Sequence, residues 1–135
     1  MDDLIINHWA VLVAAVSDFV VGALWYSPIL FYKGWMKENK FSDEDMKKGN
    51  PAVTYSVTFI LALIISYNLA FFLGDAKTDA MWGLQAGVLA GLGFAAMAFA
   101  IVAMFEKKSF KYILINGGYI TVAFALKGFI IGAWR

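Results

Sequence analysis

Four long apolar runs dominate the pattern of hydrophobic and polar positions in this chain. They cover residues 4–26, 52–73, 80–105 and 112–134, and more polar segments separate them. Each run reaches the length of about 20 residues that an α-helix needs to cross the hydrocarbon core of a bilayer. Helices satisfy their backbone hydrogen bonds internally, and these runs lack the alternation that is typical of barrel strands. The pattern therefore predicts four transmembrane helices.

The composition indicates the same fold class. Hydrophobic residues make up 61% of the 135 residues, charged residues make up 16%, and the mean hydropathy is +0.70. A soluble domain of this length could not bury so much apolar side chain. We therefore expect an all-α polytopic membrane protein in which residues 1–135 form a single four-helix domain. The lipid bilayer is its first expected partner.

The chain offers little of what several other classes of protein need. Its net charge is only +1, and it has no basic stripe interleaved with aromatic residues, so we expect no nucleic-acid partner. It has no cysteine and one histidine, His8, so we expect no metal site and no cofactor. It also lacks a Gly-x-Ser-x-Gly elbow and a phosphate-binding loop. We therefore do not expect an enzyme.

The distribution of positive charge predicts an orientation in the membrane. Two connections, residues 28–51 and 106–111, together carry eight lysines, whereas the other side has only Lys77 and Arg135. The eight residues are Lys33, Lys37, Lys40, Lys47, Lys48, Lys107, Lys108 and Lys111. Since cytoplasmic loops are enriched in lysine and arginine, both termini should lie on the non-cytoplasmic side.

The connection between the first two spans is too long for a simple turn. An aromatic and apolar segment from Ser27-Pro28 to Met36, with lysines between, predicts a short amphipathic helix at the membrane interface. Further along, Ser42 is a candidate N-cap for a short turn that ends at Gly49. We expect four residues to anchor this region at the interface, namely Trp25, Tyr26, Pro28 and Trp35.

Small residues spaced four apart predict close helix packing. The third span has Gly83, Gly87 and Gly91, and the fourth has Gly128 and Gly132. Such ladders let two helix backbones approach each other within one chain or between chains. The sequence leaves both uses open. Four helices make a thin bundle, so we also expect a homo-oligomer.

Asp18 lies inside the first apolar run and is the most informative polar residue. It shares a helix face with Ala14, Ala15 and Gly22, so it should point into the bundle. A count along the helix places it about 12 Å below the cytoplasmic boundary. The same count puts Tyr119 at that depth. Asn116 lies nearer the surface and completes the candidate proton or transport site.

Two interpretations of Asp18 remain open from the sequence. A carboxylate inside the membrane is costly, so a functional site is the first hypothesis, with Asp18 binding a proton or a cation. Alternatively, Asp18 is a neutral carboxyl group whose hydrogen bonds only fix helix packing.

A second polar layer is expected near the outer boundary of the membrane. Its candidate residues are His8, Asn68, Gln85 and Lys127, with Asn7, Ser66 and Tyr67 close by in the sequence. Lys127 could point into the bundle or extend toward the lipid headgroups. The depth count separates Lys127 from Asp18 by about 8–10 Å along the membrane normal. We therefore expect no direct ion pair between them.

The end of the first span carries a recognisable motif. Residues 22–28 read Gly-Ala-Leu-Trp-Tyr-Ser-Pro, and Trp35 follows. This segment resembles a motif of the bacterial integral membrane family named domain of unknown function 1761. The resemblance implies four spans in a chain of this length and a place in the bacterial cytoplasmic membrane. It implies no particular activity.

These observations favour two functional hypotheses. The first is a small transporter or channel-like oligomer that uses Asp18, with an unidentified small molecule or ion as substrate. The second is a non-catalytic membrane scaffold or accessory subunit that packs against partner helices through its glycine-rich faces.

Overall fold

The computed structural model describes residues 4–135, so the first three residues of the predicted domain lie outside the described part. Within that part the chain is helical and contains no strand, which confirms the predicted fold class. The helices are α1 (His8–Trp25), α2 (Tyr32–Asn39), the short 3₁₀ turn η1 (Asp45–Lys47), α3 (Pro51–Phe72), α4 (Ala80–Ala90), the π-helical segment η2 (Gly91–Ala96), α5 (Met97–Phe105) and α6 (Phe110–Ala133). Because α4, η2 and α5 are continuous, four helices are long and apolar enough to cross a membrane.

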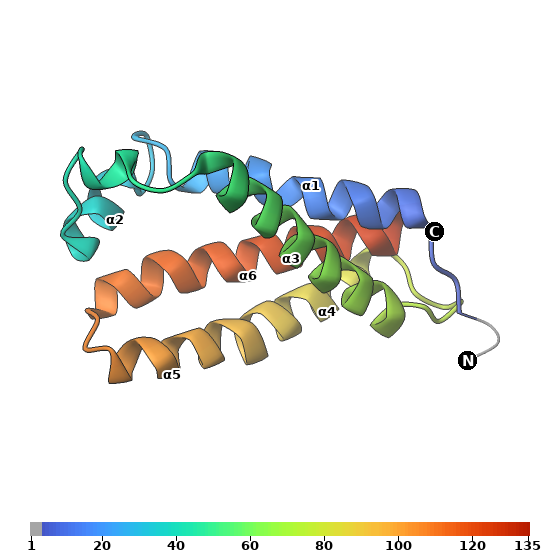
Figure 1. Ribbon diagram of the computed structural model, residues 1–135. Helices are drawn as coiled ribbons and strands as arrows, with labels where there is room; N and C mark the ends of the chain where they lie inside the picture. Colours follow the sequence, from blue (N-terminus) through green and yellow to red (C-terminus); the bar gives the residue numbers. More distant parts are fainter. Residues whose placement is uncertain (1–3) are drawn as a thin grey trace.

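Helix α6 lies at the centre of the bundle. It contacts all the other helices of the bundle, including α2 and the π segment η2. Helix α1 runs along one side of α6 and the third span along another, while α3 crosses obliquely (Figure 1). Helix α3 packs mainly on α1 and also touches α6. The bundle is therefore organised around the last helix of the chain.

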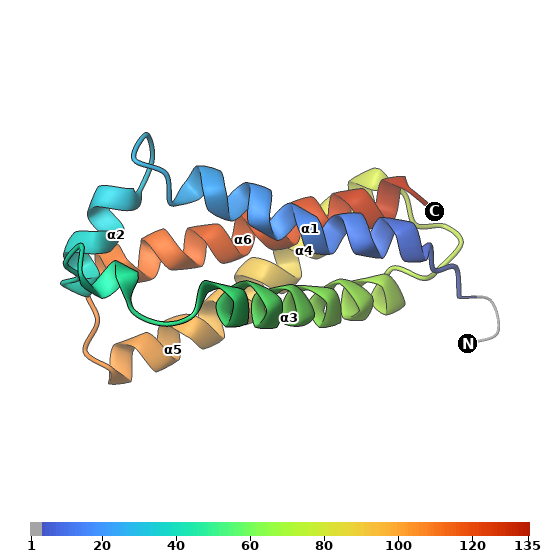
Figure 2. The same cartoon turned by 45° about the horizontal axis from the view of Figure 1, so that its top comes forward.

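The connections gather at two opposite ends of the molecule. The segment with α2 and the turn between α5 and α6 lie at one end, which we name the α2 end (Figure 2). The start of α1, the loop between α3 and α4 and the C-terminus lie at the other, which we name the terminal end. The lysine-rich connections predicted to share one side of the membrane are thus at the same end.

Polar side chains fix where the long helices begin. The side chain of Asn7 accepts hydrogen bonds from the backbone amides of residues 9 and 10, so α1 begins at His8 rather than at the predicted residue 4. The side chain of Asn50 caps α3, and that of Asp79 caps α4. Ser109 caps α6 through the amide of residue 112, so this helix begins at Phe110, two residues before the predicted run.

The short helix α2 begins later than predicted. Residues 28–31 form turns after Ser27-Pro28, and the helix begins only at Tyr32. A proline disfavours helical geometry in the residue before it, so the chain turns at this point instead of continuing as a helix. Helix α2 then lies against the start of α6, where the Ser109 hydroxyl donates a hydrogen bond to Glu38.

Hydrogen bonds between Ser42 and Asp45 stabilise the turn after α2. The backbone amide and hydroxyl of Ser42 both donate hydrogen bonds to Asp45, and the amide of Asp45 donates to the Ser42 hydroxyl. The bond from the Ser42 backbone holds the pKa of Asp45 below its ordinary value. Gly49, with a φ of 85°, follows this turn. The Ser42 side chain thus accepts a hydrogen bond as expected of a cap, but the element is a short 3₁₀ turn whose N-cap position is Glu44.

The glycine ladders pack α4 against α6 within the chain. A Cβ atom on Gly83 would collide with the backbone carbonyl of Gly128, and one on Gly132 would collide with the carbonyl of Asp79. A Cβ atom on Gly87 would likewise meet the Phe124 carbonyl. These contacts let the two backbones approach more closely than side chains would permit. Of the two uses left open by the sequence, the structure has the intrachain one.

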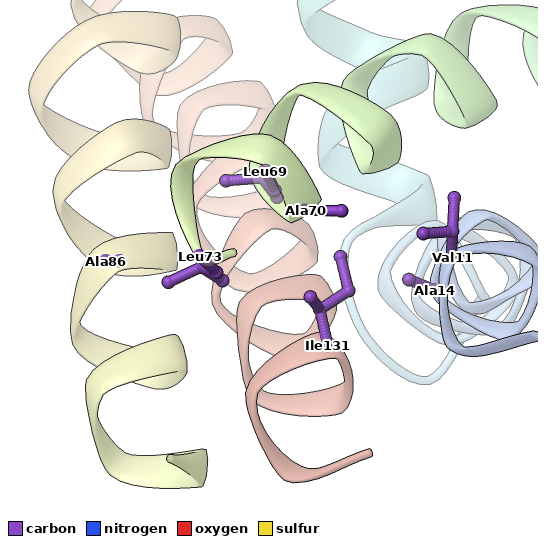
Figure 3. Close-up of a cluster of buried hydrophobic side chains, with 7 residues drawn as sticks. All are labelled: Val11, Ala14, Leu69, Ala70, Leu73, Ala86 and Ile131. Atoms are coloured by element: carbon purple, nitrogen blue, oxygen red, sulfur yellow. The ribbon is translucent and has the colours of Figure 1, made fainter. Parts of the chain in front are cut away.

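Apolar side chains from four helices meet near the terminal end. Figure 3 shows this cluster, in which α3 fits beside α1, α4 and α6. Its buried members are Val11, Ala14, Leu69, Ala70, Leu73, Ala86 and Ile131. The outward surfaces of the four spans are apolar and largely exposed, as expected for a protein surrounded by lipid. This small core therefore stabilises only the terminal end of the bundle. Contacts with α6 stabilise the remainder of the bundle.

Candidate functional site

An ion pair between Asp18 and Lys127 lies inside the bundle and joins α1 to α6. The Lys127 ammonium nitrogen is 2.5 Å from the Asp18 carboxylate oxygen. Lys127 is only 1% exposed and Asp18 only 7% exposed. The prediction that these two residues would not pair directly is therefore wrong. Of the two orientations considered for Lys127, the structure has the inward one.

The depth count failed because it placed α1 and α6 in the wrong register. It set Tyr26 level with Tyr112, as if both spans began at one boundary. In the structure the Trp25 indole nitrogen donates a hydrogen bond to the backbone carbonyl of Ile115 at 2.8 Å, and the Trp25 ring lies over Gly118. Helix α6 is thus displaced toward the α2 end, which brings Lys127 to the depth of Asp18.

The surroundings of the ion pair exclude water on the sides that the chain covers. Ala14 and Ala15 are fully buried on the α1 face that carries Asp18, as the sequence predicted. The Lys127 ammonium lies 5.0 Å from the centre of the Phe124 ring, a distance suited to a cation–π contact. Removing two charges from water costs several kcal/mol per ion, and their mutual attraction offsets this only while they stay paired.

The two predicted neighbours of Asp18 have different positions. The Tyr119 hydroxyl lies 3.5 Å from the backbone carbonyl oxygen of Asp18, so Tyr119 borders the ion pair. Asn116 does not. Its side-chain oxygen accepts a hydrogen bond from the Tyr26 hydroxyl at 2.5 Å, and its amide nitrogen donates to the Tyr112 carbonyl. The structure therefore brings one of the two predicted partners to Asp18.

A line of aromatic rings connects the ion pair with the α2 end. The Tyr119 and Tyr26 ring centres are 5.5 Å apart, and those of Tyr26 and Trp35 are 5.6 Å apart. Trp35 in turn packs edge-on against Phe41. The sequence suggested Tyr26 and Trp35 only as interface anchors. In the structure they also join α1 and α2 to α6.

The residues of the predicted outer layer do not form one site. His8 and Tyr67 are hydrogen-bonded through the His8 ring nitrogen and the Tyr67 hydroxyl at 2.8 Å, which links α1 to α3. Asn68 and Gln85 are exposed on different helices. Lys127 belongs to the ion pair with Asp18 instead.

The sequence did not predict the contacts that Phe124 and Trp25 make in this region. Phe124 is one apolar residue among many in α6, and only its position one turn before Lys127 could have indicated a contact with the ammonium. For Trp25 a signal existed, since Gly118 in the fourth span leaves room for a large ring on a neighbouring helix.

The comparison with known proteins agrees with the fold. Residues 9–132 match the family described as protein of unknown function (DUF1761). The chain belongs to this family. The match to DUF1761 reaches into all four spans and includes both members of the ion pair. No match was found among curated proteins or among solved structures.

Proposed function

We propose that this DUF1761 protein is a small proton-coupled transporter or channel-like protein of the bacterial cytoplasmic membrane. One observation carries the proposal, namely the buried ion pair of Asp18 and Lys127 between two membrane-spanning helices. Ionisable groups inside a membrane are costly, and a buried ion pair is often no more stabilising than apolar residues of the same size. A function that uses the charges accounts for their presence better than packing does.

Protonation of Asp18 gives the ion pair a way to couple proton binding to a change of structure. A neutral Asp18 would leave the Lys127 ammonium buried without its counter-charge, which is strongly unfavourable. Helices α1 and α6 would then rearrange to give the ammonium a new partner. The hydroxyl groups of Tyr119 and Tyr26 supply proton-exchanging groups between the ion pair and the α2 end.

The π-helical segment η2 is a second feature that favours a third span able to bend. Such segments occur often at functional sites, and they interrupt the regular hydrogen bonding of a helix. Helix α4 packs tightly on α6 before η2, whereas α5 contacts α6 much less after it. A rearrangement of α6 would therefore reach α4 first and could bend the third span at η2.

Proton flux in liposomes tests the proposal. The purified protein is reconstituted with a pH-sensitive dye inside the vesicles, and a pH gradient is imposed while the membrane potential is held at zero. We expect flux above that of protein-free liposomes, and we expect Asp18→Asn to reduce it to the protein-free level. Asp43→Asn, which changes an exposed carboxylate in the connection before α3, is the matched control. If the Asp18→Asn variant carried the same proton flux as the unchanged protein, the proposal would be contradicted.

The second candidate is a non-catalytic scaffold, in which the ion pair only joins α1 to α6. A dry carboxylate with its own ammonium needs no substrate. Partner helices or a second copy would have to use the exposed apolar faces, since the glycine ladders are occupied within the chain. A protein that gives no flux above protein-free liposomes, yet keeps a defined oligomer, would support this candidate.

A further inference from the structure

An apolar groove opens between α3 and the third span on the outside of the bundle. It has a volume of about 590 Å³ and is bordered by Leu69 and Phe72 of α3, Gly93 and Phe94 of η2, and Phe124 of α6. Binding sites for small molecules have volumes of roughly 300–1,000 Å³, with mostly apolar walls and a few polar groups. The size and lining of this groove fit that description.

Asn68 is the one polar side chain among the residues that border the groove. It is exposed, and its amide group makes no hydrogen bond to any part of residues 4–135. It lies about one turn before the end of α3, a helix long and apolar enough to cross a bilayer. Within the hydrocarbon region an amide without a partner is unfavourable, which favours a ligand that can hydrogen-bond to Asn68.

Phe124 separates the groove from the ion pair. Its ring lies 5.0 Å from the Lys127 ammonium, and the same residue borders the groove. The absence of a side chain at Gly91 leaves the space that the Cβ and Cγ atoms of Phe124 occupy. A molecule in the groove would therefore touch the residue that packs against Lys127.

The lack of a side chain at Gly93, in the π segment η2, leaves the groove open. A Cβ atom added at Gly93 would meet no other atom within 4 Å, so this residue faces free space. Phe94 beside it is 78% exposed. A larger side chain at Gly93 would enter the groove without disturbing the packing of α4 on α6.

We propose that this groove binds a neutral, lipid-soluble small molecule with one hydrogen-bonding group, such as a hydroxyl or a carbonyl. Its apolar part would lie between Phe72, Phe94 and Phe124, and its polar group would bind the Asn68 amide. No charged side chain borders the groove, which favours a neutral ligand. Naming this ligand as the transported substrate rests on the proposed function, whereas the binding site itself does not.

Photolabelling in lipid nanodiscs, without any proton gradient, tests the site. The probe is a long-chain alcohol with a diazirine group, and the matching diazirine alkane without the hydroxyl is the reference. We expect saturable labelling of α3, η2 and α6 by the alcohol, which the unmodified alcohol displaces and the unmodified alkane does not. Asn68→Leu should weaken the apparent affinity for the alcohol about fivefold and leave alkane labelling unchanged.

Two further variants complete the experiment. Gly93→Leu should abolish labelling by both probes because it fills the groove. Gln85→Leu removes an exposed amide of α4 that does not border the groove, and it should change nothing. If a variant fails to fold, displacement of the photolabel from the unchanged protein by the unmodified alcohol, but not by the alkane, still tests the site.

Three outcomes would overturn the inference. Equal labelling and displacement by alcohol and alkane would mean that the groove holds only the acyl chains of the bilayer. Labelling that Gln85→Leu weakens as much as Asn68→Leu would place the site elsewhere. Crosslinks between two copies at Phe94, with no labelling by either probe, would assign the groove to an oligomer contact. If one of these outcomes occurred while proton flux was intact, the groove inference would fail and the proposed function would stand. If the alcohol bound but no flux occurred, the groove inference would stand and the proposed function would fail.

Discussion

Asp18 and Lys127 depend on each other because each is the counter-charge of the other inside an apolar bundle. A neutral packing carboxyl was the interpretation of Asp18 that assumed no ion pair. The structure places the Lys127 ammonium beside the carboxylate, which removes that assumption. The pair lies where α1 offers only small residues, so the long lysine side chain can reach the carboxylate from α6. The pair therefore links one position along α1 to one position along α6.

Removing one member of the pair should destabilise the protein more than removing both. We expect Asp18→Leu and Lys127→Met each to lower the free energy of unfolding by about 3–5 kcal/mol, because each leaves a buried charge unpaired. The double variant, with apolar groups at both positions, should regain most of this loss. Thermal unfolding in detergent, analysed as a double-mutant cycle, measures the difference. Additive losses would show that the two charges do not interact.

Helix α6 is the element on which the rest of the bundle depends. One of its faces carries the glycines that receive α4, another carries Lys127 opposite α1, and its start carries the contacts with α2. The hydrophobic run predicted this helix as a span, but a run of apolar residues carries no signal for which neighbours it contacts.

Two glycines of α6 should respond differently to the same substitution. Gly128→Ala places a methyl group against the Gly83 carbonyl, so we expect a loss of about 1–3 kcal/mol in the free energy of unfolding. Gly117→Ala places it at an ordinary contact distance of 3.8 Å from Ala96, so stability should stay the same or rise slightly. Thermal unfolding of both variants in one detergent gives the comparison. Equal gains in stability would mean that helix propensity, not the contact with α4, decides the outcome.

For the molecule as a whole, local signals were predictable and distances between helices were not. The four long apolar runs and the glycine ladders are each encoded in neighbouring residues, and the structure has four long apolar helices and close packing at the glycines. The contact of Asp18 with Lys127 depends on how far α6 slides along α1. That register is set by the fit of Trp25 over Gly118 and by other contacts between distant segments. An error of about one helical turn in the register was enough to separate two residues that are in contact.

The orientation of the whole molecule remains a prediction that the chain itself makes easy to test. The α2 end carries eight lysines and the terminal end carries Lys77 and Arg135, so the α2 end should face the cytoplasm. Since the chain has no cysteine, Lys48→Cys and Lys77→Cys each introduce a single reactive thiol in an exposed loop. We expect a membrane-impermeant maleimide to label Lys77→Cys in intact spheroplasts, and to label Lys48→Cys only after the membrane is opened. The reverse pattern would place both termini in the cytoplasm, and a proton entering along Tyr26 and Tyr119 would then start from the outside.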